Sequence, residues 1–165
     1  MDKLLQNMVI YSTILAVGFW LTGQWRAHGM IPVGAPISHY ELNDLQGGRE
    51  FLPSDGRAQL IYLFAPWCRI CSITIEDINS RHADYNNVVS IALSYQSVEE
   101  VRVFVGEGAA PNQVLLGNPA LAGEFNILAF PSYIIIDSHG RIAARRTGYM
   151  PGWMLSLYLA WYGVE

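Results

Sequence analysis

The chain has 165 residues, of which 52% are hydrophobic, and a net charge of −4. This length suits one domain with a layered core, and the high hydrophobic share predicts that part of the chain lies in lipid. The absence of a basic cluster argues against nucleic acid as a partner, and two cysteines are too few for a structural disulfide framework.

The first predicted element is a membrane helix. No charged residue occurs between Leu4 and Trp25, and a helix over this stretch is long enough to span the roughly 30 Å hydrocarbon core. Trp20 and Trp25 lie towards one end, where aromatic side chains favour the membrane interface. A cleaved signal peptide is the alternative, but residues 24–29 offer no Ala-x-Ala cleavage site. We therefore predict an uncleaved anchor over residues 1–25.

Residues 26–35 are interrupted by glycine and proline and are predicted to be a linker to a domain over residues 36–165. Pro36–Leu42 alternates polar and apolar residues, as an edge strand does. Residues 43–48 supply turn residues, and Arg49–Leu52 can return as a partner strand. The domain is thus predicted to begin with a β-hairpin.

A short apolar segment, Leu60–Phe64, is predicted to be a strand, and the chain's two cysteines follow it. Cys68 and Cys71 precede a predicted helix over residues 72–83, whose N-terminus favours a thiolate over a thiol. Arg69 adds a positive charge that lowers a thiol pKa in the same way. The arrangement predicts thiol–disulfide exchange, with Cys68 as the attacking nucleophile and Cys71 resolving the mixed disulfide.

Other roles for the cysteine pair fit the sequence less well. A structural zinc site needs about two more Cys or His ligands, and no second close-spaced pair exists. Covalent haem attachment needs a histidine directly after the second cysteine, where this chain has Ser72. We therefore predict no metal and no cofactor besides a redox-active Cys68–Cys71 disulfide.

Residues Phe64–Cys71 (Phe-Ala-Pro-Trp-Cys-Arg-Ile-Cys) resemble the active site of the thioredoxin superfamily. Over Pro36–Tyr162 the chain looks most like its TlpA/ResA branch of membrane-anchored, extracytoplasmic thiol–disulfide oxidoreductases. The resemblance implies an α/β fold in which helices flank a central mixed sheet, with an N-terminal β-hairpin extension and a transmembrane helix. It also implies a single-pass protein of the inner (cytoplasmic) membrane, with its domain facing the periplasm or the cell exterior. Charge does not orient the anchor, because Lys3 and Arg26 balance each other.

After the cysteines, predicted strands and helices alternate, which indicates a sheet between helices. Ser97 opens a capping box, and Asn118 can cap a helix that has proline at its first position. The expected strands are residues 87–93, 114–116 and 141–147, and the expected helices are 97–105, 118–125 and 151–162; residues 137–140 form a turn.

A second motif contains Pro131, which directly precedes an apolar strand candidate. The resemblance implies that Pro131 has a cis peptide bond and lies beside the cysteines. Trp67, Phe130 and Pro131 would then form the substrate-binding surface, with the backbone of Phe130 pairing with an extended segment of the partner.

The last predicted helix is apolar on all sides but too short to span a bilayer. Two interpretations stay open: the helix packs against the sheet, or Trp153, Trp161 and Tyr162 contact the membrane surface or a membrane partner.

The chain departs from the family pattern at two places. Thioredoxins often have a buried aspartate six positions before the first cysteine, and here that position is Tyr62. A water molecule or Glu76 would have to accept the proton of the resolving thiol. The dipeptide between the cysteines, Arg69–Ile70, tunes the reduction potential, so the direction of electron flow is open.

The favoured function is that of an enzyme, a membrane-anchored protein-disulfide reductase. The resemblance implies disulfide-bearing exported partners, such as apocytochrome c or a copper-site protein, and a membrane electron donor that re-reduces the domain. A thiol oxidase or isomerase is one alternative. A peroxidase is disfavoured because Pro66 and Trp67 precede Cys68, where a peroxidase usually has Thr-x-x. A Sco-like copper-delivery protein is a further alternative. Such a protein would have Cys-x-x-x-Cys and a histidine at the position of Pro131, so this chain fits it less well.

Overall fold

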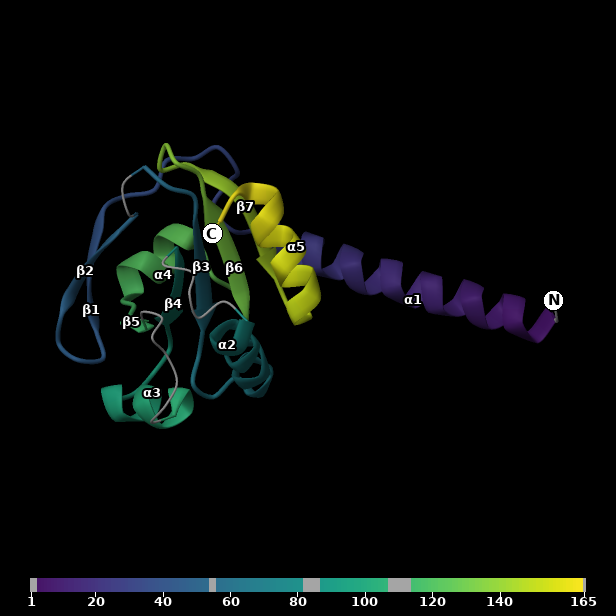
Figure 1. Ribbon diagram of the computed structural model, residues 1–165, viewed down its shortest axis with the longest axis horizontal. Coiled ribbons are helices and arrows are strands. Elements are labelled where there is room, and N and C mark those ends of the chain that lie inside the picture. Colours follow the sequence, from purple (N-terminus) through teal and green to yellow (C-terminus); the bar gives the residue numbers. More distant parts are fainter. Residues whose placement is uncertain (1–2, 54–55, 82–86, 107–113, 165) are drawn as a thin grey trace.

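The computed structural model describes residues 3–53, 56–81, 87–106 and 114–164 of the chain (Figure 1). Its elements are α1 (Lys3–Ala27), β1 (Tyr40–Asp44), β2 (Arg49–Leu52), β3 (Gln59–Phe64), α2 (Arg69–Arg81), β4 (Val88–Ala92), α3 (Val98–Val105), β5 (Val114–Leu116), α4 (Pro119–Phe125), β6 (Ser132–Ile136), β7 (Ile142–Thr147) and α5 (Gly152–Tyr162).

The strands form one seven-stranded mixed sheet in the order β2-β1-β5-β4-β3-β6-β7. Strands β3, β4 and β5 pair in parallel, and β6, β7, β1 and β2 complete the sheet with antiparallel pairs. All residues of β3, β4 and β6 are buried. This explains their near-continuous apolar sequence, since a strand covered on both faces has no polar side. The predicted mixed sheet flanked by helices is confirmed.

Helices cover both faces of the sheet, so the domain has two cores. Successive side chains of a strand point to opposite faces. Accordingly, Tyr62 and Phe64 pack with α2, α3 and α5, whereas Ile61 and Leu63 pack with α4 and the segment before β1.

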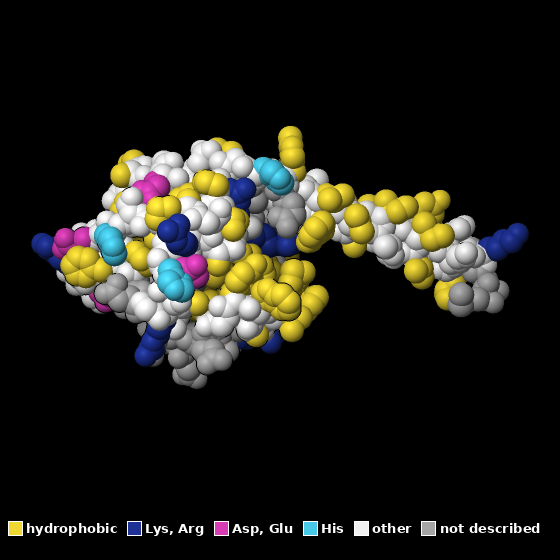
Figure 2. Space-filling view, turned by 90° about the horizontal axis from the view of Figure 1, so that it is seen from above, with side chains coloured by type: hydrophobic (Ala, Val, Ile, Leu, Met, Phe, Trp, Pro, Cys, Tyr) yellow, Lys and Arg dark blue, Asp and Glu magenta, His cyan; other side chains and the backbone are white. Residues whose placement is uncertain are grey.

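Helix α1 extends away from the domain, with hydrophobic side chains along its length (Figures 1 and 2). Within the described part of the chain, it is the helix long and apolar enough to cross a membrane, over Leu5–Gly23. Its C-terminal end approaches β7 so closely that a Cβ atom at Gly23 would lie 3.2 Å from the carbonyl oxygen of Thr147. That this helix is a membrane anchor stays a prediction, because the finding rests on length and composition.

The segment between α1 and β1 contains core residues, although it was expected to be a linker. Met30 and Ile31 are buried, and the Ile31 N–H donates to the carbonyl of Phe125 at 3.1 Å. The guanidinium of Arg145 donates to the carbonyls of both residues. Two apolar side chains in a segment rich in glycine and proline are thus held by contacts with α4 and β7.

The first strand differs from the prediction. Strand β1 is Tyr40–Asp44 instead of residues 36–42, and it lies inside the sheet, where β2 is the edge. The reason is non-local, since Asn43 and Asp44 pair with Leu116 and Leu115 of β5. The predicted return strand, Arg49–Leu52, is confirmed as β2.

Helix boundaries agree best where a side chain caps the helix. Ser97 Oγ accepts from the N–H of Glu100 at 3.2 Å, and Asn118 Oδ1 accepts from the N–H of Leu121 at 2.9 Å, as predicted. Helix α2, which has no such cap signal, begins at Arg69 instead of residue 72. Its predicted last residue, Ala83, lies outside the described residues.

Candidate active site

The cysteines and the proline loop meet at one end of the sheet. Strands β3 and β6 run antiparallel with Leu63 opposite Ser132, so the chain that leaves β3 lies beside the chain that enters β6. The first of these segments carries Cys68, and the second carries Pro131. Two motifs that are far apart in the sequence therefore form one site.

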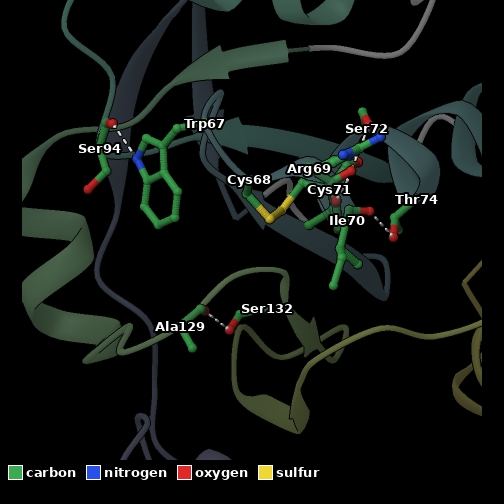
Figure 3. Close-up of a disulfide and its surroundings, with 11 residues drawn as sticks. Trp67, Cys68, Arg69, Ile70, Cys71, Ser72, Thr74, Ser94, Ala129 and Ser132 are labelled. Carbon is green, nitrogen blue, oxygen red and sulfur yellow. Dashed lines mark hydrogen bonds between the residues drawn. A yellow bond between two sulfur atoms is a disulfide. The ribbon is translucent and has the colours of Figure 1, made fainter.

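Cys68 and Cys71 form a disulfide, with their Cα atoms 5.2 Å apart. Cys68 directly precedes α2 and keeps 8% of its surface exposed, whereas Cys71 lies in the first turn and is fully buried. The N–H of Cys71 donates to the carbonyl of Cys68 at 2.9 Å, which closes this turn. Figure 3 shows the disulfide facing the loop that carries Ala129 and Ser132.

The loop before β6 has the conformation that the resemblance implied. The Phe130–Pro131 peptide bond is cis, and Pro131 is buried. The Pro131 carbonyl accepts from the N–H of Gly148 at 2.9 Å. Within the described residues the backbone of Phe130 makes no hydrogen bond.

Trp67 forms one side of the site and is 65% exposed. Its ring packs edge-to-face on Phe130, with the ring centroids 5.6 Å apart. Its indole N–H donates to the carbonyl of Ser94 at 3.1 Å (Figure 3). Ser94 has a φ of 53°, a left-handed conformation that is uncommon outside glycine. Sequence reasoning missed this residue, which orients the indole.

A groove of about 460 Å³ lies next to Trp67 and was also not predicted. It is lined by Leu93, Ser94, Tyr95, Asn118 and Pro119, among others. These residues follow the carboxyl ends of β4 and β5, the parallel neighbours of β3. Ligands of open α/β sheets bind outside the carboxyl ends of parallel strands. The predicted strands could therefore have indicated the position of this groove.

Arg69 is exposed in the first position of α2, beside the disulfide. Its carbonyl accepts from the Ser72 hydroxyl at 2.8 Å. The predicted positive charge is therefore next to the cysteines, at the protein surface.

Tyr62 lies beneath the disulfide, on the buried side of α2. Its hydroxyl donates to the carbonyl of Cys71 at 3.1 Å, and burial raises its pKa well above the usual value of 10. Burial also raises the pKa of the neighbouring Tyr133 to about 12. The position of the thioredoxin aspartate thus holds a neutral phenol that cannot act as a base near pH 7. Glu76, the suggested substitute, is exposed on α2.

The fold and the disulfide define a thiol–disulfide oxidoreductase of the thioredoxin superfamily. The chain belongs to the Redoxin family, which it matches over residues 32–159. The family match covers the cysteine pair and the proline loop and starts after α1.

The individual relatives share little sequence identity with this chain. The thioredoxin-like protein YneN of Bacillus subtilis is 24% identical over 126 residues, which cover 73% of this chain and 74% of YneN. The fold is similar to that of a thiol:disulfide interchange protein DsbE from Chlorobium tepidum, with a TM-score of 0.69, 18% identity, and coverage of 81% of this chain and 98% of that one. It is also similar to StoA from Bacillus subtilis, with a TM-score of 0.64, 19% identity and coverage of 76% and 98%.

Proposed function

We propose that this protein is a membrane-anchored reductase of disulfides in exported proteins. The observation that carries the proposal is the geometry of the disulfide. A slightly exposed Cys68 directly precedes a helix, and a buried Cys71 lies in the first turn of that helix. The loop from Ala129 to Ser132, which contains Phe130 and Pro131, faces the pair.

The reaction is a dithiol exchange. In the reduced protein the Cys68 thiolate, favoured by the start of α2 and by Arg69, attacks one sulfur of the partner's disulfide. The partner's other sulfur leaves as a thiolate and takes up a proton. Cys71 then loses its proton and attacks the Cys68 sulfur, which releases the second partner thiol. Two electrons have passed to the partner, and the protein is left with the Cys68–Cys71 disulfide seen in the structure.

The difference in exposure supports these two roles. An incoming disulfide can reach Cys68, which keeps 8% of its surface, but not Cys71. Trp67 and Phe130, whose rings pack against each other, offer aromatic surface next to Cys68. The partner's extended chain would pair with the free backbone of Phe130.

The anchor and the location belong to the same proposal. Helix α1 has the length and composition of a membrane span, and protein disulfides, the substrates of such a reductase, persist mainly in oxidising compartments outside the cytoplasm. After each turnover a dithiol donor in the membrane would restore the reduced state. Among the relatives, the Chlorobium protein is named for thiol–disulfide interchange. We extend that role to this chain, with apocytochrome c or a copper-site protein as the expected kind of partner.

Trapping with the full-length Cys71→Ala variant tests the proposal. Without Cys71 the mixed disulfide cannot be resolved, so partners should accumulate covalently attached to Cys68. They can be identified after non-reducing electrophoresis by mass spectrometry. We expect exported proteins with cysteine pairs, and no adduct in the matched Cys68→Ala/Cys71→Ala variant.

Three results would contradict the proposal. Adducts that persist in the double variant, or that contain only cytoplasmic proteins, rule out the assigned chemistry or the location. A reduction potential of the wild-type couple near that of DsbA, about −120 mV, rules out the reductase, whereas a value near that of thioredoxin, about −270 mV, supports it. A reduction potential near that of DsbA would instead indicate a thiol oxidase or isomerase.

A further inference from the structure

We propose that α5 lies on the surface of the lipid bilayer, with the side chains of Trp153, Leu157 and Trp161 in contact with lipid. This inference rests on the proposed membrane anchoring by α1. It assigns a second membrane contact to the catalytic domain itself.

The first observation is an apolar stripe on α5 that the fold leaves uncovered. Trp153, Leu157 and Trp161 are spaced four residues apart, so they lie along one face of the helix. They are 62%, 64% and 83% exposed, whereas Leu155 and Leu159 on the opposite face are buried in the core. The helix contains no charged residue. Packing against the sheet therefore explains one face of α5 and leaves the aromatic face unexplained.

The second observation is the position of α5 relative to the anchor. The end of α1 contacts β7 at Thr147, and α5 begins shortly afterwards in the chain, at Gly152. Figure 1 shows α5 on the side of the domain from which α1 leaves. In Figure 2 hydrophobic side chains gather on the body beside the base of α1. When α1 spans a bilayer, this side of the domain faces the lipid.

The dimensions favour a helix that lies on the membrane. At about 1.5 Å per residue, the 11 residues of α5 measure about 16 Å, roughly half of the hydrocarbon thickness. Tryptophan side chains prefer the interface between lipid and water. Trp25, near the end of α1, is also exposed and would lie at the same level of the membrane. The bilayer surface is thus an occupant that suits both the length and the composition of the stripe.

Basic side chains flank the helix. A Cβ atom at Gly152 would lie 2.9 Å from Nε of Arg81, and the charge of Arg146 acts on Tyr158 of α5. The acidic Asp77 is also close, at 3.5 Å from Arg81. Because Arg81 is paired with Asp77, its charge is largely balanced, and Arg146 supplies the positive charge that suits anionic headgroups.

Fluorine NMR of the full chain can test this contact. The protein is labelled with 5-fluorotryptophan and placed in nanodiscs of phosphatidylcholine and phosphatidylglycerol, with or without a lipid that carries a spin label on its acyl chain. Each resonance is assigned by a single Trp→Phe substitution. We expect the spin label to broaden the signals of Trp153, Trp161 and Trp25 at least twofold more than that of Trp67. Because Trp67 is as exposed as Trp153, exposure alone cannot produce this difference.

A matched pair of variants isolates the stripe. Leu157→Gln should reduce the broadening of Trp153 and Trp161 at least twofold. Val103→Gln, which changes a 74% exposed side chain on α3, should leave it unchanged. An unchanged chemical shift of Trp67, whose ring contacts Phe130 and Ser94, shows that each variant is folded.

The possible failures are distinguishable. Broadening of Trp25 without broadening of Trp153 and Trp161 overturns the inference and leaves the anchor intact. Absence of broadening at all three residues means that the proposed anchoring fails. Equal broadening of Trp67, or no effect of Leu157→Gln, also overturns the inference, because the lipid contact would then not be made by this stripe.

Discussion

Among single residues, Tyr62 departs most from what the resemblance implies. Its ring is buried between Phe64 and Tyr133, and its hydroxyl donates to the carbonyl of Cys71. A phenol at this position holds the first turn of α2, and so the backbone of Cys71, without introducing a buried charge. Its role is that of a positioning residue, because it touches the backbone of Cys71 and no reacting atom.

We expect Tyr62→Phe to lower the free energy of unfolding of the oxidised protein by about 1 kcal/mol, because it removes a buried hydrogen bond and little volume. Urea denaturation of the full chain in detergent measures the change. Tyr133→Phe is the matched control, since the Tyr133 hydroxyl is buried without a hydrogen-bond partner among the described residues. Removing the Tyr133 hydroxyl should lower the free energy of unfolding by less than removing the Tyr62 hydroxyl. An equal loss in both variants would contradict the role given to Tyr62.

Among the secondary-structure elements, β5 and α4 meet at a closely packed junction. Gly117 connects the two, and its N–H donates to the carbonyl of Ala92 at 2.9 Å. A Cβ atom there would lie 2.5 Å from Leu93 and 2.9 Å from the Ala92 oxygen. The glycine is therefore required by a close approach of two backbones next to the groove beside Trp67.

Two glycine substitutions should change stability in opposite directions. Gly117→Ala forces a methyl group into this contact and should destabilise the protein by about 1–3 kcal/mol. Gly123→Ala lies within α4, where nothing is within 4 Å of the added Cβ. It should stabilise the protein by about 0.5–1 kcal/mol, because alanine is the better helix former. Chemical denaturation of both variants checks the prediction, and the same sign in both would refute the packing argument.

For the molecule as a whole, buried and half-buried tyrosines determine the response to alkaline pH. Burial raises the pKa values of Tyr40, Tyr133 and Tyr158 to about 12, and that of Tyr62 well above its usual value. The folded state thus favours the neutral phenol. The stability that these groups contribute is complete below about pH 10, the pKa in the unfolded chain, and is lost as the pH rises towards 12.

We therefore expect the protein to unfold between about pH 10 and 12, with tyrosinate absorbance and the loss of secondary structure rising together. Circular dichroism and near-ultraviolet absorbance of the full chain in detergent measure both. Tyr158→Phe removes one such phenol and should move the transition to higher pH. The expectation fails if all nine tyrosines ionise with a midpoint near pH 10 while the secondary structure is intact.

Some parts of the fold were predictable because their signals are local. The structure confirms the two predicted helix caps, Ser97 and Asn118, because a capping side chain bonds to a backbone N–H only three residues away. Strand β5 and helix α4 also lie where they were expected. The predicted bounds of β1 were wrong, because Asn43 and Asp44 are typical turn residues and become part of a strand only through their pairing with β5.

The same division between local and non-local signals applies to the candidate active site. The order of strand, Cys-x-x-Cys and helix predicted the disulfide and its place at the start of a helix, because these depend on neighbouring residues. What faces the cysteines was decided by the tertiary structure. The Ser94 carbonyl beneath the Trp67 indole and the Tyr62 hydroxyl on Cys71 are contacts between residues 27 and 9 positions apart. Contacts of this kind form only when the sheet brings its strand ends together, and no local pattern in the chain encodes them.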